Sequence, residues 1–339
     1  MRVDPQLVDQ QSMDEFLVRN HLAQQGERGR WTPLSGGVSS DIWRVDLASG
    51  PLCVKRALPK LKVTADWHAP TSRNAYEWAW LRFASEHVPE AVPRTLAHDP
   101  DAGLFAMAFL DPADHPLWKG QLMDGVADPA VAAAVGHTLA TLHARSADDV
   151  HLAQAFDTLD NFHALRLDPY LLVTGRRHPE LAPQLTALSE RTGALKIALV
   201  HGDISPKNIL VGPRGPVLLD AECAWYGDPA FDVAFCLNHL LLKCLVRPGQ
   251  VDAYLRCFDA FVSAYIELCT WESRDGLESR AASLLPGLFL ARVDGKSPVE
   301  YLRDEGAKHL VRVCAIPLIL HPPATLGEVK QAWRSLLLK

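Results

Sequence analysis

One short run in the second half of the chain restricts the fold and the chemistry more than any other feature. The run His201-Gly202-Asp203-Ile204-Ser205-Pro206-Lys207-Asn208 follows the apolar segment 197–200, which is predicted to be a strand. A later apolar strand is predicted to end at Asp220. This arrangement would bring together the side-chain oxygens of Asp203, Asn208 and Asp220. Such groups suit a proton acceptor and Mg²⁺, which prefers hard oxygen ligands.

The order of predicted elements indicates an α+β fold rather than alternating strands and helices. Strands dominate the first 110 residues, and helices dominate the rest, beginning with an Ala-rich segment at 129–145. We therefore expect a strand-rich domain over 1–110 and a helical domain over 111–339. The elements expected in the first domain are helices over 6–25 and 74–84 and strands over 31–34, 42–47, 52–57 and 104–110.

Composition excludes several classes of protein. The net charge of -6 gives no general attraction to nucleic acid or anionic lipid. The longest apolar tract, 233–246, contains Lys243 and is too short to span a bilayer. The first residues lack the apolar core of a signal peptide, and the seven cysteines form no C-x-x-C pair. These features favour a cytoplasmic protein with reduced thiols and without nucleic-acid or membrane partners.

The H-G-D-x-x-x-x-N run, the D-x-E at 220–222 and the G-D-P-x-x-D at 227–232 resemble the aminoglycoside phosphotransferase and choline kinase type family. These small-molecule kinases are relatives of protein kinases. The resemblance implies a bilobal protein-kinase-like fold and transfer of the ATP γ-phosphate to a hydroxyl of a small molecule. It implies that Asp203 is catalytic and that Asp232 braces the loop. Asn208, Asp220 and Glu222 would hold Mg²⁺.

A lysine on the third predicted strand resembles the kinase lysine that binds the ATP α- and β-phosphates. Lys55 is preferred to Arg56, which strand alternation places on the other face. Its expected carboxylate partner is Glu77, because Glu77 lies on the apolar stripe of helix 74–84 and a carboxylate there requires a buried partner. Glu86 is the alternative, but it lies at the helix end, where solvation is easier.

Two further segments complete the expected nucleotide site. The run 35–40 contains Gly36, Gly37, Ser39 and Ser40 between two predicted strands, and could cover the phosphates with backbone N–H groups and hydroxyls. An ordinary hairpin turn is the alternative interpretation of this run. By resemblance, strand 104–110 leads to the hinge between the lobes, where backbone groups of Ala108 and Leu110 would bind adenine.

The acceptor and the nucleotide preference, ATP or GTP, stay open, as does the oligomeric state. Only 223–227 separates Glu222 from Asp228, too little for the peptide-binding segment of a protein kinase. A protein kinase and an inactive nucleotide-binding pseudokinase are the alternatives to a small-molecule kinase. The segment 220–305 has 14 acidic and 8 basic residues, which mildly favours a cationic or neutral acceptor. Residues whose roles stay open are Arg176, Arg177, Lys207, Trp225, Tyr226, Arg292 and Lys296.

Overall fold

The structure is a computed structural model that describes residues 5–34, 39–60, 67 and 70–338, except for the side chains of 5–11. It divides into two compact units, Met1–Arg82 with Pro93–Asp111 and Phe83–Val92 with Pro112–Lys339. The sequence-based boundary at residue 110 differs from this division in the segment Phe83–Val92 and by one residue at Asp111. No helix in the described part of the chain is long and apolar enough to cross a membrane.

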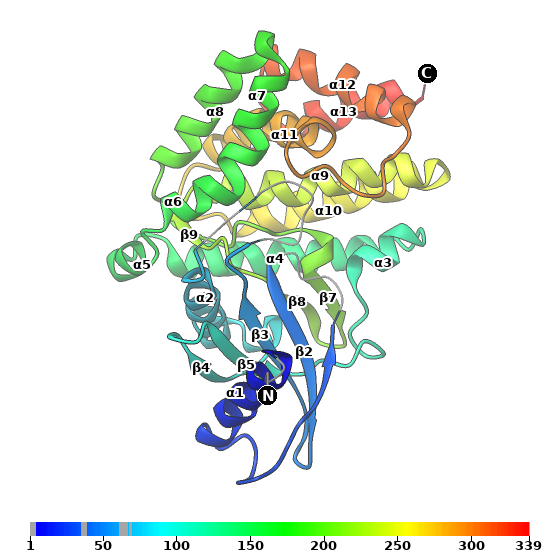
Figure 1. The fold of residues 1–339 in the computed structure, drawn as a ribbon. Helices are drawn as coiled ribbons and strands as arrows, with labels where there is room; N and C mark the ends of the chain where they lie inside the picture. Colours follow the sequence, from blue (N-terminus) through cyan, green and yellow to red (C-terminus); the bar gives the residue numbers. More distant parts are fainter. Residues whose placement is uncertain (1–4, 35–38, 61–66, 68–69, 339) are drawn as a thin grey trace. The chain divides into compact units, whose positions relative to one another are not determined.

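The first unit is built on a five-stranded antiparallel sheet with the order β1-β2-β3-β5-β4 (Figure 1). The predicted strands are present, and β4 was not anticipated because a register shift after Thr95 breaks its alternation. The elements are α1 (Pro5–Arg19), β1 (Arg30–Pro33), β2 (Ser40–Leu47), β3 (Gly50–Ala57), α2 (Arg73–His87), β4 (Thr95–Asp99) and β5 (Leu104–Ala108).

Two helices bury the two faces of this sheet. Met13, Phe16 and Leu17 of α1 pack with inward residues of the strands in one apolar cluster. On the other face, the Trp78 ring of α2 packs against Phe105 with ring centroids 5.9 Å apart. Helix α1 ends at Arg19, earlier than predicted, because His21 adopts a left-handed backbone with φ of 59°. Leu22 still packs against the cluster from outside the helix.

The second unit is mainly helical, as the sequence predicted. Its long helices α4, α10, α9 and α11 pack successively against one another (Figure 1). The helices are α3 (Trp118–Met123), α4 (Pro129–Ser146), α5 (Val150–Ala155), α6 (Leu159–Phe162), α7 (Val173–Arg177), α8 (Ala182–Ala194), α9 (Ala230–Val246), α10 (Val251–Leu268), α11 (Arg274–Asp294), α12 (Glu305–Leu320) and α13 (Leu326–Leu337).

Two small antiparallel pairs of strands frame the motif-bearing loops of this unit. The first pairs β6 (Ala198–Val200) with β9 (Trp225–Gly227), and the second pairs β7 (Ile209–Gly212) with β8 (Gly215–Leu218). Because β6 leads into His201 and β8 ends just before Asp220, the two pairs fix both ends of the candidate site. The remaining short segments are a π-helix, η2 (His163–Leu172), and 3-10 turns η1 (Pro89–Ala91), η3 (Pro179–Leu181), η4 (Pro206–Asn208) and η5 (Pro248–Gln250).

Candidate active site

The loop after β6 is held in place by a buried carboxylate at the start of α9. The backbone N–H groups of His201 and Gly202 donate to the two carboxylate oxygens of Asp232, each at 2.8 Å. His143 Nε2 lies 3.3 Å from Asp232 Oδ2, and its Nδ1 lies 2.7 Å from the Tyr265 hydroxyl. The loop conformation is thus fixed by a chain of buried hydrogen bonds. The family resemblance implied the bracing by Asp232, whereas the sequence analysis gave no role to His143.

Gly202 allows this loop to approach the segment that follows Asp220. Its φ is +78°, and a Cβ atom there would lie 2.6 Å from the Cys223 carbonyl oxygen. Real Cβ atoms do not make contacts so short, so a larger residue would push the two segments apart. The glycine of H-G-D therefore serves both the left-handed turn and the close approach.

His201 joins the loop to the strand that carries Asp220. Its Nδ1 accepts the Asp203 backbone N–H at 3.1 Å, so its Nε2 carries the proton and donates to the Leu219 carbonyl at 3.1 Å. Burial lowers the pKa of His201, although the nearby Asp232 charge opposes this shift. The imidazole ring is therefore neutral. The Leu219 N–H donates to the Asn208 carbonyl at 2.9 Å. These bonds place Asp220 beside the loop.

Three polar side chains surround the Asp203 carboxylate. Its Oδ2 accepts from Asn208 Nδ2 at 2.8 Å, and the Arg166 guanidinium and Lys207 Nζ lie 2.9 and 3.1 Å away. Its Oδ1 is also buried, but finds no hydrogen-bond partner within the described residues. Burial alone would raise the pKa of Asp203, but Arg166 and Lys207 outweigh it and hold that pKa below its ordinary value. The result is a charged carboxylate with one oxygen left for a ligand.

Arg166 is a residue at the Asp203 carboxylate that the sequence analysis missed. It lies in the π-helix η2, an element that occurs often at functional sites. Its Nε donates to the Gly202 carbonyl at 2.6 Å, and its guanidinium carbon lies 5.6 Å from the centre of the Phe235 ring. Burial alone would lower the pKa of Arg166, but the Asp203 charge outweighs burial and raises that pKa above its ordinary value. The signal in the sequence was a single arginine between Leu165 and Leu167.

The residues predicted to hold Mg²⁺ supply suitable donors. The Asn208 amide nitrogen is used by Asp203, and no hydrogen bond in the described chain uses its Oδ1. Asp220 has a φ of 68°, uncommon for a non-glycine residue, and its negative charge reaches Asp203. Glu222 is buried, and its carbonyl accepts from Asn161 Nδ2 at 2.9 Å.

The described chain contains no group of three or more His, Cys, Asp or Glu side chains arranged to hold a metal. Mg²⁺ usually keeps several waters and is held by only one or two carboxylates, so Asn208 and Asp220 would supply part of its shell. Substrate phosphates commonly complete the shell of Mg²⁺, so the donor set fits this ion.

In the first unit, the structure brings Lys55 and Glu77 together. Lys55 Nζ lies 2.6 Å from Glu77 Oε2 and 2.8 Å from Oε1, and both side chains are 3% exposed. Arg56 faces the other way, 3.1 Å from Asp41 and over the Trp43 ring. Strand alternation and the apolar stripe of α2 thus predicted the pairing correctly, while the role of Lys55 toward ATP stays a prediction.

The structure describes only part of the segment predicted to cover phosphates. Gly36 and Gly37 lie outside the described residues. Ser39 and Ser40 are buried. Arg73 at the start of α2, which the sequence analysis did not consider, donates to the Ser39 carbonyl and, at 2.6 Å, to the Leu58 carbonyl. This arginine fixes the end of the glycine-containing segment against α2.

The predicted adenine-binding backbone lies at the end of β5. The Ala108 N–H donates to the Arg94 carbonyl at 2.8 Å, so it is already used within the sheet. Leu110 lies beyond the strand, and among the described residues its backbone makes no hydrogen bond. Of the two predicted residues, Leu110 is therefore the better donor for a ligand.

The structure also shows how several residues left open by the sequence are used. Trp225 stacks on Phe162 with ring centroids 4.2 Å apart, and the Tyr226 hydroxyl lies 3.0 Å from the Ser146 and Ile197 carbonyl oxygens, between which its one hydrogen is shared. Both aromatic residues therefore belong to the core. Arg177 donates to the Asp294 carbonyl at the end of α11, and Arg176 lies 3.0 Å from Asp168.

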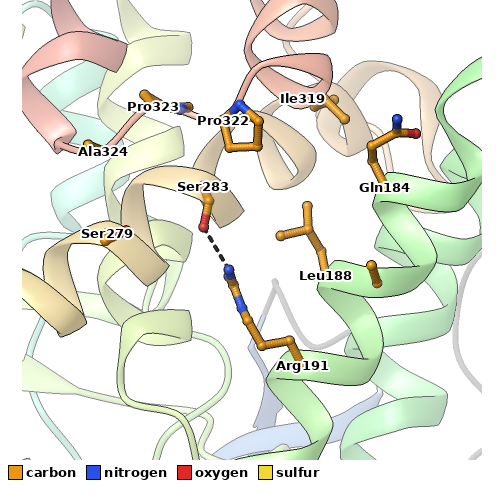
Figure 2. A pocket seen from close by; sticks show the side chains of 10 residues that line it. Gln184, Leu188, Arg191, Ser279, Ser283, Ile319, Pro322, Pro323 and Ala324 are labelled. Atoms are coloured by element: carbon orange, nitrogen blue, oxygen red, sulfur yellow. Dashed lines mark hydrogen bonds between the residues drawn. The ribbon is translucent and has the colours of Figure 1, made fainter.

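A pocket of about 460 Å³ lies apart from these loops, lined by α8, α11 and residues 319–324 (Figure 2). Arg191 reaches into it and donates to Ser283 Oγ at 2.9 Å. The lining also includes Gln184, Leu188 and Pro322, and no carboxylate from the described chain. Without a proton acceptor or metal ligands, this pocket does not have the chemistry of the loop at Asp203.

Known proteins with similar sequences include phosphotransferases and kinases. A model of the phosphotransferase enzyme family matches residues 30–267. Methylthioribose kinase of Cronobacter sakazakii is 30% identical over 230 residues, which are 59% of this chain and 56% of that relative. The chain thus spans little more than half the length of this relative.

Two solved structures share the fold at low sequence identity. Ethanolamine kinase of Plasmodium vivax has a TM-score of 0.53 and 11% identity, over 96% of this chain and 86% of that one. Choline kinase of Streptococcus pneumoniae has a TM-score of 0.51 and 12% identity, over 91% and 98%. The fold expected from the loop motifs is thereby confirmed, and the chain belongs to the phosphotransferase enzyme family.

Proposed function

We propose that this protein is a kinase that transfers the γ-phosphate of ATP to a hydroxyl group of a small molecule. The observation that carries the proposal is the Asp203 carboxylate, whose Oδ1 is buried and unpartnered within the described residues. An acceptor hydroxyl bound there would donate its hydrogen to Oδ1. This hydrogen bond would orient the hydroxyl oxygen for attack on phosphorus.

The electrostatics of the loop suit a late proton transfer. Arg166 and Lys207 lower the pKa of Asp203, so the carboxylate stays charged but is a weak base. Phosphoryl transfer passes through a loose transition state in which positioning and charge neutralisation contribute most. Asp203 would therefore chiefly orient the hydroxyl and receive its proton as the new P–O bond forms.

The other predicted residues take roles around the nucleotide. Lys55, held by Glu77, would bind the α- and β-phosphates, and the backbone of Leu110 would bind adenine. Ser39, Ser40 and the glycines at 36 and 37 would cover the phosphates. Bound Mg²⁺ would neutralise phosphate charge, held by Asn208 and Asp220 with support from Glu222. Each of these roles stays a prediction from the family motifs.

The chain between Asp220 and α9 favours a small acceptor over a protein. Strand β9 ends at Gly227 and α9 begins at Ala230, so the chain has no room there for a peptide-docking segment. A cytoplasmic location is compatible with the seven cysteines, all free and buried.

The test is ADP release across a panel of sugars, amino alcohols, sugar acids and aminoglycosides, with wild type and two variants. Asp203→Asn removes the proposed base. Asp157→Asn is the matched control, because Asp157 is exposed and pairs only with Lys196 in the described chain. Acceptor-dependent ADP release by wild type and Asp157→Asn, but not by Asp203→Asn, supports the proposal. ATP binding without release for any acceptor would instead indicate an inactive nucleotide-binding protein.

A further inference from the structure

A second, much smaller pocket in the helical unit adjoins the Asp203 loop. Its volume is about 20 Å³, on the order of one water molecule, so it suits one small chemical group rather than a whole metabolite. Basic side chains dominate its lining. The lining residues are Lys119 of α3, Pro206 and Lys207 of η4, His239 and Lys243 of α9, Arg292 of α11, and Glu300 and Tyr301.

Lys243 is the unusual member of this lining. Its residue is 1% exposed, and within the described chain no carboxylate lies within 4.0 Å of its ammonium group. Its ammonium group lies over the Tyr301 ring, whose centre is 3.7 Å from Nζ. Burial, together with the charge of Lys119, lowers the pKa of Lys243 to about 7. A buried cation without a counter-charge is costly unless a partner arrives from outside.

Three more polar atoms in the lining are buried without a partner among the described residues: His239 Nε2, Arg292 Nε and the Tyr301 hydroxyl. One nitrogen of the Arg292 guanidinium is occupied, because Nη1 donates to the Tyr170 hydroxyl at 2.9 Å and to the Ser297 carbonyl. Buried polar atoms are nearly always satisfied in proteins, so such a cluster around one pocket points to a ligand.

The single carboxylate of the lining does not balance its positive charge. Glu300 forms an ion pair with Lys119, and both lie toward the surface, with side chains 64% and 29% exposed. Lys119 Nζ also lies 5.9 Å from the centre of the Tyr301 ring, which therefore contacts two cations. The charge of Arg292, and that of Lys243 when it is protonated, therefore have no paired carboxylate among the described residues.

Lys207 connects this pocket to the chemistry. It lines the pocket, and its Nζ lies 3.1 Å from Asp203 Oδ2. Partial desolvation would lower the pKa of Lys207, but Asp203 and Asp220 raise it, so this lysine is charged. A group bound at Lys243 and Arg292 therefore lies one side chain from the carboxylate that would accept the hydroxyl proton.

We infer that the acceptor molecule carries an anionic group, a carboxylate or a phosphate, which binds at Lys243, Arg292 and Tyr301 while its hydroxyl meets Asp203. This inference rests on the proposed function. It departs from the expectation of a cationic or neutral acceptor, which used the net charge of segment 220–305. Most acidic residues of that segment lie outside the pocket, whose lining is basic.

The inference is tested with four hydroxyl compounds that differ mainly in charge: glucose, glucosamine, gluconate and glucose 6-phosphate. ADP release and calorimetric binding are measured for each with wild type, Lys243→Met, Tyr301→Phe and a control, Lys308→Met. Lys308 is partly exposed, pairs with Glu305 and does not line the pocket. We expect binding and turnover to favour the acidic compounds.

Lys243→Met should lower kcat/KM for the acidic acceptor by about 10- to 100-fold, as for loss of a hydrogen bond to a charged group. Tyr301→Phe keeps the ring and should cost about 3- to 10-fold. Both variants should leave the KM for ATP within about twofold of wild type, and Lys308→Met should change neither value. Loss of ATP affinity in Lys243→Met would overturn the inference, because the pocket would then bind a nucleotide phosphate.

The inference would also be overturned if the preferred acceptor were glucose or glucosamine and Lys243→Met left its turnover unchanged. If no compound is turned over, binding decides: acidic compounds that bind wild type and not Lys243→Met support the anion pocket, although the proposed activity fails. Failure of both acidic compounds to bind wild type contradicts the inference, whatever the protein does with ATP.

Discussion

Two buried lysines, one in each unit, differ in whether the protein supplies a carboxylate partner. Lys55 has the Glu77 carboxylate at 2.6 Å, whereas Lys243 has the face of Tyr301 and no carboxylate within 4.0 Å in the described chain. The first lysine is held by a carboxylate of the protein itself, which fixes its position. The second lacks such a counter-charge, so its favourable partner must come from a ligand. The difference distinguishes a positioning ion pair from a binding site.

Asp203 combines both situations in one carboxylate. Its Oδ2 is held by Asn208, Arg166 and Lys207, while its Oδ1 has no partner within the described residues. The held oxygen fixes the direction of the other one. A group that is positioned on one side and unsatisfied on the other is suited to act on a bound substrate.

The largest effect is expected when the Asp203 carboxylate is replaced by an amide. Asp203→Asn keeps the size of the side chain but removes its negative charge and its capacity to accept a proton. Loss of a general base costs about 10²–10⁴-fold in rate. We expect kcat to fall by that factor while ATP still binds in calorimetry. A kcat within a few-fold of wild type, with an intact melting curve, would show that Asp203 is not the base.

The effects of substituting Lys55 and Glu77 should be coupled. Removing one member of a buried pair costs about 3–5 kcal/mol, because the other charge remains buried. We expect Lys55→Met and Glu77→Gln each to destabilise the protein and weaken ATP use, and the double variant to lose less than the sum. Denaturant unfolding of all four proteins gives this coupling, expected at about 0.5–3 kcal/mol. Additive losses would mean that the two residues act independently.

The approach of the Asp203 loop to Cys223 can be tested without changing any charge. Gly202→Ala should destabilise the protein by more than the roughly 1–2 kcal/mol of a left-handed alanine, because its Cβ would also meet the Cys223 carbonyl. Gly26→Ala is the matched control, since Gly26 has nearly the same φ, +80°, and nothing within 4 Å of its Cβ position. Equal losses in both variants would show that the close approach is unimportant.

The smallest effect concerns pH. An unfolded lysine titrates near 10.4, and Lys243 in the fold near 7, so between these values the unfolded chain binds one more proton. Stability therefore rises with pH across this window, and the cost of the buried charge is fully present below pH 7. Lys243→Met lacks this cost, so it should be more stable than wild type at pH 7. Its free energy of unfolding should exceed that of wild type by about 1–2 kcal/mol less at pH 9 than at pH 7.

This difference isolates Lys243, because both proteins keep the other groups that face it: Lys119, His239, Arg292, Glu300 and Tyr301. Unfolding by urea at several pH values measures it. A constant difference between the two proteins would mean that Lys243 titrates normally.

The parts of the site that the sequence predicted are those within short stretches of chain or regular elements. Asp203 and Asn208 lie five residues apart on one loop, and the pairing of Lys55 with Glu77 follows from strand alternation and one helical stripe. Residues brought together only by the tertiary fold could not be found this way. Arg166 meets a loop 37 residues later in the chain, and Lys119 meets Glu300 across 181 residues.

The same reason explains why two strands were missed and why the charge of a whole segment differs from that of the pocket. Net charge over 220–305 averages the surface with the pocket, whose basic residues come from α3, η4, α9 and α11. Strands β4 and β9 are short and defined mainly by their partners, β5 and β6. The role of Lys207 was left open by the sequence. In the structure its Nζ contacts Asp203 although its side chain is 43% exposed.

The central claim is that the Asp203 loop transfers phosphate to a small acidic molecule. The most direct measurement incubates wild type and Asp203→Asn with γ-labelled ATP, a filtered metabolite extract and a dialysed protein extract, and separates the labelled products by size and by anion exchange. We predict that wild type places the label on a small product more acidic than a simple phosphate monoester, and that Asp203→Asn does not. Label on proteins alone, on a product with no second anionic group, or equally in both samples would contradict the account.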